Sequence, residues 1–228
     1  ISMNMRLRAI LFLIISLLSL WACNQSSLPR VSSVISDKSC TPPCWEQITP
    51  GKTVRKEVKL LLEEISWIKK DSIKDTSTVS PGDSIKWMGS STAADYSGRV
   101  FFDNDTVSLI TISPNDGVLH IADLIARLGD PENILIVYAK GEKTIISVLI
   151  LYPSKGYGFT DYYESSNTNP ETVIDVRPEE NIRQVWYCEP TNFNDFLSNG
   201  QIAYLSANLI KQGTQTWNGF GKYPYAKN

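Results

Sequence analysis

The first hydrophobic segment of the chain is an apolar run close to its beginning. Arg6 and Arg8 precede it, and only two serines interrupt the apolar residues from Ala9 to Leu20. A run of this length with a positive flank is typical of a signal peptide and is short for a transmembrane helix. Residues 24–39 are rich in serine and keep no sustained period, which predicts a flexible spacer of roughly 50 Å when fully extended.

Two later segments carry apolar residues at the spacing of an amphipathic helix. The first begins at residue 54 and fades over 67–70, with Thr53 as its expected N-cap. The second covers 118–128, where Gly129 suits the position after the last turn and Pro131 prevents continuation. The apolar stripes are Val54, Val58, Leu61, Leu62 and Ile65 in the first helix, and Ile121, Leu124, Ile125 and Leu128 in the second.

The remaining pattern predicts β-structure. Strands are expected at 84–90, 99–103, 106–113, 133–139, 144–152, 157–163 and 182–188. Asn104-Asp105 and residues 140–143 suit hairpin turns. Segments 71–83 and 168–178 are expected to be loops, and 203–210 is ambiguous between helix and strand.

These elements predict an α+β fold over residues 40–228. An Ile-x-Pro turn precedes each helix, at Ile48 and at Ile112, and Val54 and Val118 follow at the same offset. A single helix on a small sheet buries its apolar face poorly, whereas two such units side by side bury it well. We therefore expect one compact domain of two helix-plus-antiparallel-sheet units. The similarity between the segments that precede the two helices has two interpretations, a tandem repeat and chance.

Composition limits the function classes. The chain has 228 residues, 42% of them hydrophobic and 20% charged, which is enough to build a core. Its formal net charge is −2, so no basic excess favours nucleic acid, and we expect no nucleic-acid partner. Cleavage after residue 22 would remove two arginines and no acid, which leaves 206 residues with net charge −4.

The end of the apolar run, Leu20-Trp21-Ala22-Cys23, resembles the lipobox of bacterial lipoproteins, although Trp21 departs from the usual small residue. The resemblance implies a signal peptide over 1–22, lipidation of Cys23, and a lipidated tether over 23–39. Two or three acyl chains (palmitate among them) would hold the protein outside the cytoplasm on the cell membrane or outer membrane. An uncleaved anchor helix and a plain secretory peptide are the alternatives.

Further motifs resemble known envelope proteins. Ile-Thr-Pro-Gly-x-Thr over 48–53 and Leu-Gly-Asp-Pro over 128–131 are similar to the BamE/SmpA outer-membrane lipoproteins and to β-lactamase inhibitor proteins. The former motif follows Pro43-Cys44-Trp45, and the combination resembles a group of uncharacterised bacterial lipoproteins that also have a late cysteine after a strand, here Cys188. These resemblances imply a fold and an envelope address, and they bring no known activity.

Three cysteines remain after Cys23. In an exported protein two of them are expected to form a disulfide, and 40–44, 40–188 and 44–188 are all open. The resemblance favours Cys44–Cys188, which leaves Cys40 as an unpaired or alternative thiol. A bridge that closes so long a loop is worth about 4–5 kcal/mol in the chain-entropy model.

The stock of catalytic residues is small. His120 is the only histidine and no Cys-x-x-Cys occurs, so we expect no metal, no cofactor and no assigned catalytic residue. Paired carboxylates could hydrolyse a glycosidic bond. The candidates for that role are Asp103, Asp105, Asp161, Glu164, Glu179 and Glu180.

Aromatic side chains are the other candidate for function, because exposed rings bind sugars or partner proteins. One group is Tyr157, Phe159, Tyr162 and Tyr163, and the other is Trp217, Phe220, Tyr223 and Tyr225. The sequence as a whole favours a lipid-anchored envelope protein with a non-catalytic binding role toward an envelope protein or a surface ligand. A carbohydrate-active or cell-wall hydrolase and a carbohydrate-binding module are the alternatives.

Overall fold

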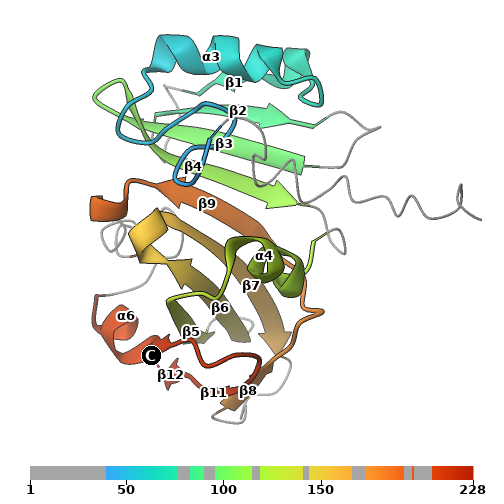
Figure 1. The fold of residues 1–228 in the computed structure, drawn as a ribbon, viewed down its shortest axis with the longest axis vertical. Coiled ribbons are helices and arrows are strands. Elements are labelled where there is room, and N and C mark those ends of the chain that lie inside the picture. The colour runs from blue at the N-terminus through green and yellow to red at the C-terminus, as the bar shows by residue number, and fades with distance from the viewer. Residues whose placement is uncertain are drawn as a thin grey trace, which may run out of the picture.

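The computed structural model describes residues 40–76, 83–89, 96–114, 119–140, 144–165, 173–192, 197 and 207–227. The expected signal peptide, Cys23 and the tether lie outside these ranges. The fold is α+β, with helices packed on a large, mostly antiparallel sheet (Figure 1). None of the helices in these ranges has the length and apolar character needed to cross a membrane.

The elements follow the expected order with additions near the C-terminus. The helices are α3 (Arg55–Glu64), α4 (Ile121–Leu128) and α6 (Ala207–Gly213). The strands are β1 (Lys74–Asp75), β2 (Ser84–Met88), β3 (Tyr96–Asp103), β4 (Thr106–Pro114), β5 (Asn133–Lys140), β6 (Thr144–Tyr152), β7 (Tyr157–Ser165), β8 (Val173–Val176), β9 (Gln184–Cys188), β10 (Thr214–Thr216), β11 (Gly221–Pro224) and β12 (Ala226–Lys227).

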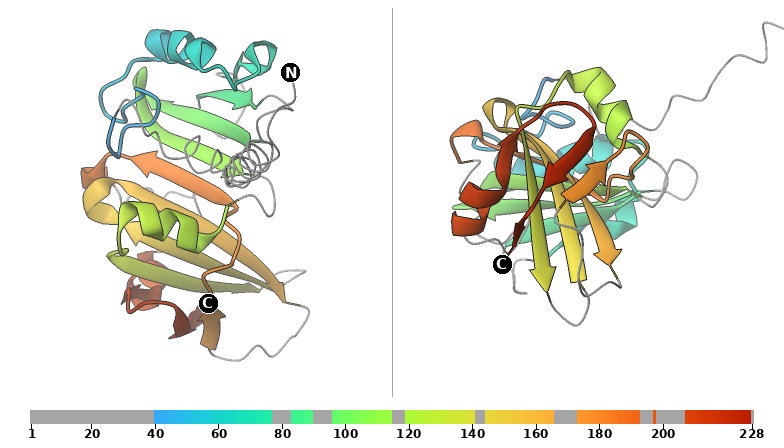
Figure 2. Two further views of the ribbon diagram at one scale, coloured as in Figure 1. Left: turned by 45° about the vertical axis from the view of Figure 1, so that its right-hand side comes forward. Right: turned by 90° about the horizontal axis from the view of Figure 1, so that it is seen from below.

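One sheet runs through the molecule in the order β1-β2-β3-β4-β9-β7-β6-β5-β10, and β12 pairs in parallel with β5. Two three-strand meanders, β2 to β4 and β5 to β7, form its halves. The later strand β9 pairs with β4 on one side and β7 on the other, so it joins the halves (Figure 2). β8 and β11 form a separate two-stranded sheet.

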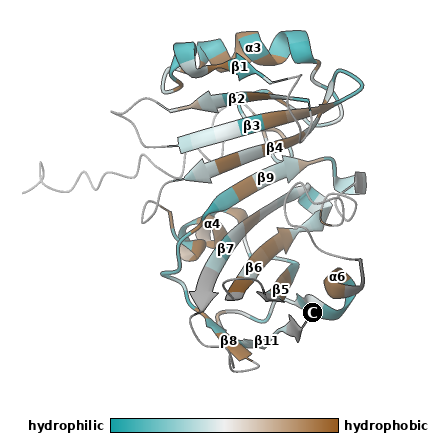
Figure 3. Ribbon diagram, turned by 180° about the vertical axis from the view of Figure 1, so that it is seen from behind, coloured by the Kyte–Doolittle hydropathy of each residue, from teal (hydrophilic) through white to brown (hydrophobic). Residues whose placement is uncertain are grey.

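The sheet buries two apolar layers, one on each face. We call the face under α3 and α4 the front face and the opposite one the back face. The front-face cluster includes Val58 and Leu62 of α3 and Ile121 and Leu124 of α4, packed on strand residues from both halves. The back-face cluster is smaller and is covered by residues from α6, which lies beside β5 (Figure 3).

The hairpin turn at Asn104-Asp105 is confirmed. Both residues have positive φ, 47° and 66°, and they join β3 directly to β4. This backbone geometry matches the right-handed twist of paired strands, and Asn and Asp tolerate it well.

Several expectations about local structure are wrong. Thr53 is not the N-cap of α3, because its Oγ1 accepts a hydrogen bond from the Thr49 N–H at 2.8 Å and Val54 takes the cap position. The expected loops over 71–83 and 168–178 contain β1 and β8. Both strands form through partners elsewhere in the chain, β2 and β11, which local pattern does not show.

The expected Cys44–Cys188 bridge is also wrong. The structure joins Cys40 to Cys44, with their Cα atoms 5.6 Å apart, and Cys188 is a free, buried thiol. The Cys44 N–H donates to the Thr41 carbonyl at 3.0 Å, and this turn brings the two cysteines within disulfide range. Cys188 lies on the back face, in a cluster with Leu109 and Trp186.

Candidate functional site

The two halves of the back face differ in chemistry. Over β5, β6 and the end of β9 an apolar cluster covers the back face, and Leu197 and Leu209 belong to it. Over β1 to β4 most back-facing side chains are polar or charged, because β2 and β3 alternate between residues buried at the front and residues exposed or half-buried at the back. Alternation of this kind is what a strand with one solvated face requires.

Three cations form a row across the polar half. Lys74 of β1 is the Cα partner of Lys86 in β2, and Lys86 is the partner of Arg99 in β3. Because neighbouring strands lie about 4.8 Å apart, this cationic row spans about 10 Å. Lys74 and Lys86 are exposed and Arg99 is half-buried, with its guanidinium 5.6 Å from the centre of the Phe101 ring.

The cationic row has no carboxylate partner among the described residues. An ion pair lies at the rim of this half, where Lys69 Nζ is 3.6 Å from Asp71 Oδ2. In the same rim Ser72 Oγ accepts from the Met88 N–H at 2.9 Å and donates to the Lys69 carbonyl. These bonds fix the turn that carries Lys74 against the edge of β2.

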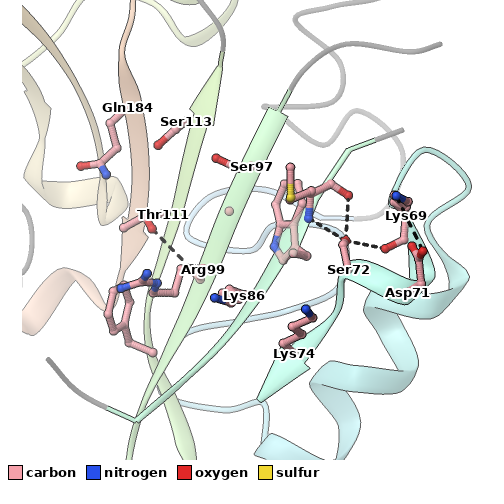
Figure 4. Close-up of a pocket in the computed structure, with 14 residues that line it drawn as sticks. Lys69, Asp71, Ser72, Lys74, Lys86, Ser97, Arg99, Thr111, Ser113 and Gln184 are labelled. Carbon is pink, nitrogen blue, oxygen red and sulfur yellow. Dashed lines mark hydrogen bonds and ion pairs between the residues drawn. The ribbon is translucent and has the colours of Figure 1, made fainter. Parts of the chain in front are cut away.

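A pocket of about 670 Å³ opens over this part of the sheet (Figure 4). The volume falls within the range of small-molecule sites. Beside the cationic row, its lining includes the hydroxyl and amide side chains of Ser97, Thr111, Ser113 and Gln184. The pocket therefore offers fixed positive charge at one end and neutral hydrogen-bonding groups toward β9.

Buried polar atoms without partners continue from the pocket toward the middle of the sheet. Thr160 Oγ1 and Gln184 Oε1 sit on directly paired residues of β7 and β9, and neither has a hydrogen-bond partner in the described parts of the chain. Thr160 is fully buried. Leaving such groups unsatisfied costs about 1–3 kcal/mol each, and Gln184 is the member of this pair that lines the pocket.

His120 has a structural role. It precedes α4 as the N-cap residue, whereas the sequence placed it in the first helical turn. Its backbone N–H donates to Asp123 Oδ2 at 3.1 Å, and it forms an isolated bridge with Asn181. Both contacts use its backbone to fix the start of the helix.

Four of the six candidate carboxylates form ion pairs, and Asp103 is the exposed last residue of β3. Asp161 is buried and lies 3.6 Å from Arg183 Nε, and Asp105 pairs with Arg55. Glu179 and Glu180 both pair with Arg177, while the side chain of Glu164 lies outside the described parts. The structure brings no two of the described candidates together as a facing pair in the pocket.

The aromatic candidates are mostly core residues. Tyr157 and Phe159 are fully buried, and the C-terminal group packs on itself, with Trp217 stacked on Tyr223 at 5.9 Å between ring centres. Tyr162 and Phe220 are the exposed members among those described. A continuous aromatic platform for sugar binding is therefore not formed by these residues.

Cys188 is a poor nucleophile. Burial, with a smaller contribution from Glu189, raises the pKa of its thiol to about 12. A thiol with this pKa is protonated at physiological pH and reacts slowly. Within the described ranges no three His, Cys, Asp or Glu side chains gather as metal ligands.

Comparison with protein families, with curated proteins and with solved structures finds no match for this chain. The back-face pocket, with its cationic row and polar lining, is the candidate site that the geometry offers.

Sequence reasoning missed the cationic row. The signal was present, because Lys86 and Arg99 occupy polar positions in alternating segments. Their alignment depends on the register between β2 and β3, and Lys74 belongs to a strand that was expected to be a loop. Only the pairing of the strands shows that the three residues share one row.

Proposed function

We propose that this protein is a non-catalytic binding protein of the bacterial cell envelope, held by lipid on Cys23, and that its back-face pocket is the binding site. The observation that carries the proposal is the contrast within one sheet face. Its apolar half is covered by α6, whereas its polar half carries a pocket lined by cations, hydroxyls and an amide.

The proposed location in the cell envelope rests on the sequence. Leu-Trp-Ala-Cys over 20–23 follows the apolar run, and the serine-rich residues 24–39 separate it from the folded body. The disulfide between Cys40 and Cys44 agrees with a compartment outside the cytoplasm, because disulfides persist in oxidising surroundings.

The proposal includes a relation between the two halves of the sheet. In each half a helix is followed by a three-strand meander, α3 with β2 to β4 and α4 with β5 to β7. In each half the first strand of the meander lies farther from β9 and the last strand pairs with it. This shared order supports an internal repeat and a relation to the BamE/SmpA and β-lactamase inhibitor folds.

The anchor is tested by the variant Cys23→Ala. We expect the variant to lose incorporated palmitate and to leave the membrane fraction, because the lipid is the proposed attachment. Cys40→Ala serves as the matched control and should keep both the label and the membrane fraction. A Cys23→Ala protein that stays in the membrane with unchanged acyl content would contradict the anchor.

The binding role is tested by affinity capture from detergent-solubilised membranes, with charge reversal of the pocket as the comparison. We expect Lys86→Glu to lose a partner or ligand that the native chain retains. Recovery of the same species by both proteins, or of none in repeated experiments, would count against the pocket as the binding site.

A further inference from the structure

We infer that the back-face pocket binds an elongated anion that carries two or more phosphate groups, and that the cationic row of Lys74, Lys86 and Arg99 is its principal recognition element. This inference rests on the binding part of the proposed function and is independent of the lipid anchor.

Like charges face one another along the cationic row. Lys74 faces Lys86, and Lys86 faces Arg99, as direct cross-strand partners. Like charges opposite one another destabilise a sheet. No carboxylate in the described parts of the chain pairs with any of the three, so an anionic ligand would relieve the repulsion.

The spacing of the three cations suits more than one phosphate group. A row of about 10 Å exceeds the reach of one phosphate group, since its oxygens accept hydrogen bonds from donors about 2.8 Å away. Two or more phosphates in a chain can contact all three cations. The tetrahedral group also directs oxygens away from the cations, toward the Ser97 and Ser113 hydroxyls that line the same pocket.

The cationic row lies on the face of a sheet, where side chains are the groups available to a ligand. Backbone N–H and C=O groups in β2, β3 and β4 are used in the strand ladders, so a peptide lying over these three strands would find no free backbone groups to pair with. Recognition here depends on side chains alone, which favours a ligand whose binding groups are its charges.

Two other polyanions fit less well. Single-stranded nucleic acid is held largely by stacking on aromatic rings, and Phe101, the ring beside the row, is buried under Arg99. An anionic membrane presents a broad surface, whereas the row lines a pocket. Asp71, a carboxylate in the pocket lining, is paired with Lys69 at the rim.

The test is calorimetric titration of the full chain, purified in nonionic detergent, with tripolyphosphate. We expect binding that weakens steeply with added salt. The double variant Lys74→Gln/Lys86→Gln should bind on the order of 10–100-fold more weakly, because each lost charge contact contributes roughly 3–10-fold. Lys222→Gln, at an exposed lysine on β11, is the matched control and should bind as the native chain does.

The outcomes separate the parts of the proposal. Absence of tripolyphosphate binding, or equal weakening in Lys222→Gln, overturns it. If orthophosphate binds as tightly as tripolyphosphate, several phosphates are not required. If citrate binds as tightly, the site has no preference for phosphate. If the row binds anionic vesicles and not tripolyphosphate, its ligand is a membrane. If the Cys23→Ala protein leaves the membrane and still binds tripolyphosphate normally, both the anchor and the site are supported. If the anchor test fails and binding still depends on the cationic row, the site alone is supported.

Discussion

Arg55 is the first residue of α3, a position where the helix dipole disfavours a cation. Ion pairs with three carboxylates offset this unfavourable position. The guanidinium lies 2.9 Å from the Asp75 carboxylate and 3.2 Å from the Asp105 carboxylate, and it contacts the Asp83 carboxylate. It also lies over the Phe102 ring at 4.1 Å. One side chain thus joins α3 to β1, to the start of β2 and to the β3–β4 turn.

Replacement of Arg55 by alanine should lower the free energy of unfolding by about 2–3 kcal/mol, because it leaves three carboxylates near one another and removes the ring contact. Lys59→Ala removes an exposed pair with Glu63 at 4.0 Å and should change stability by less than about 0.5 kcal/mol. Urea unfolding of both variants measures the difference. Equal effects would show that the cluster around Arg55 contributes no more than a surface ion pair.

Two glycines in the sheet each lie beneath an indole ring of the neighbouring strand. Gly98 of β3 is covered by Trp87 of β2, and Gly158 of β7 is covered by Trp186 of β9. The close approach lets Trp87 lie flat on the sheet, where it stacks on Trp45 at 5.4 Å between ring centres. The missing side chain at Gly98 therefore helps to seat the segment that contains the disulfide.

Gly98→Ala should destabilise the protein by about 2 kcal/mol or more, because the added methyl group meets the Trp87 ring and a packed core does not yield readily. Near-ultraviolet circular dichroism should also change as the stack of Trp45 and Trp87 is disturbed. Ser97→Ala, at the neighbouring exposed position, is the control. The explanation fails if both variants unfold at the same urea concentration with unchanged spectra.

Local pattern predicted the elements whose partners are close in sequence. Both helices, the β3–β4 hairpin and the β5–β6–β7 meander follow the expected periodicity. The elements that were missed depend on distant partners, since β8 pairs with β11 and the tail strands β10 and β12 both pair with β5. The site was missed for the same reason, because its row of cations exists only once β1, β2 and β3 are aligned.

At the scale of the whole molecule, burial of ionisable groups links stability to pH. Desolvation raises the pKa values of Tyr152, Tyr157 and Tyr187, and the rings of Tyr157 and Tyr187 lie 4.8 Å apart. The pKa of the Cys188 thiol rises to about 12 for the same principal reason. These groups keep their protons in the folded state at pH values where the unfolded chain releases them.

Below about pH 8.5 these groups should leave the free energy of unfolding unchanged. Above that pH the unfolded chain loses the Cys188 proton first, and above about pH 10 it loses the tyrosine protons, so the free energy of unfolding should fall. Each group adds a slope of up to about 1.4 kcal/mol per pH unit. Urea unfolding between pH 8 and pH 11 measures the slope. The variant Tyr187→Phe should reduce the slope by about the contribution of one titrating group. A constant free energy of unfolding across this range would contradict the role assigned to the buried phenols.

If the chain is attached through Cys23, as we propose, the Cys40–Cys44 disulfide has a mechanical consequence. Tension along the chain would enter the folded body at Cys40 and pass through the covalent bridge to Cys44, bypassing residues 41–43. It would then reach Trp45, which is wedged beside Trp67 and Trp87 in the front-face cluster. The force would therefore act on a packed aromatic cluster and not on the end of a loop. The folded body should then resist unfolding from its attached side.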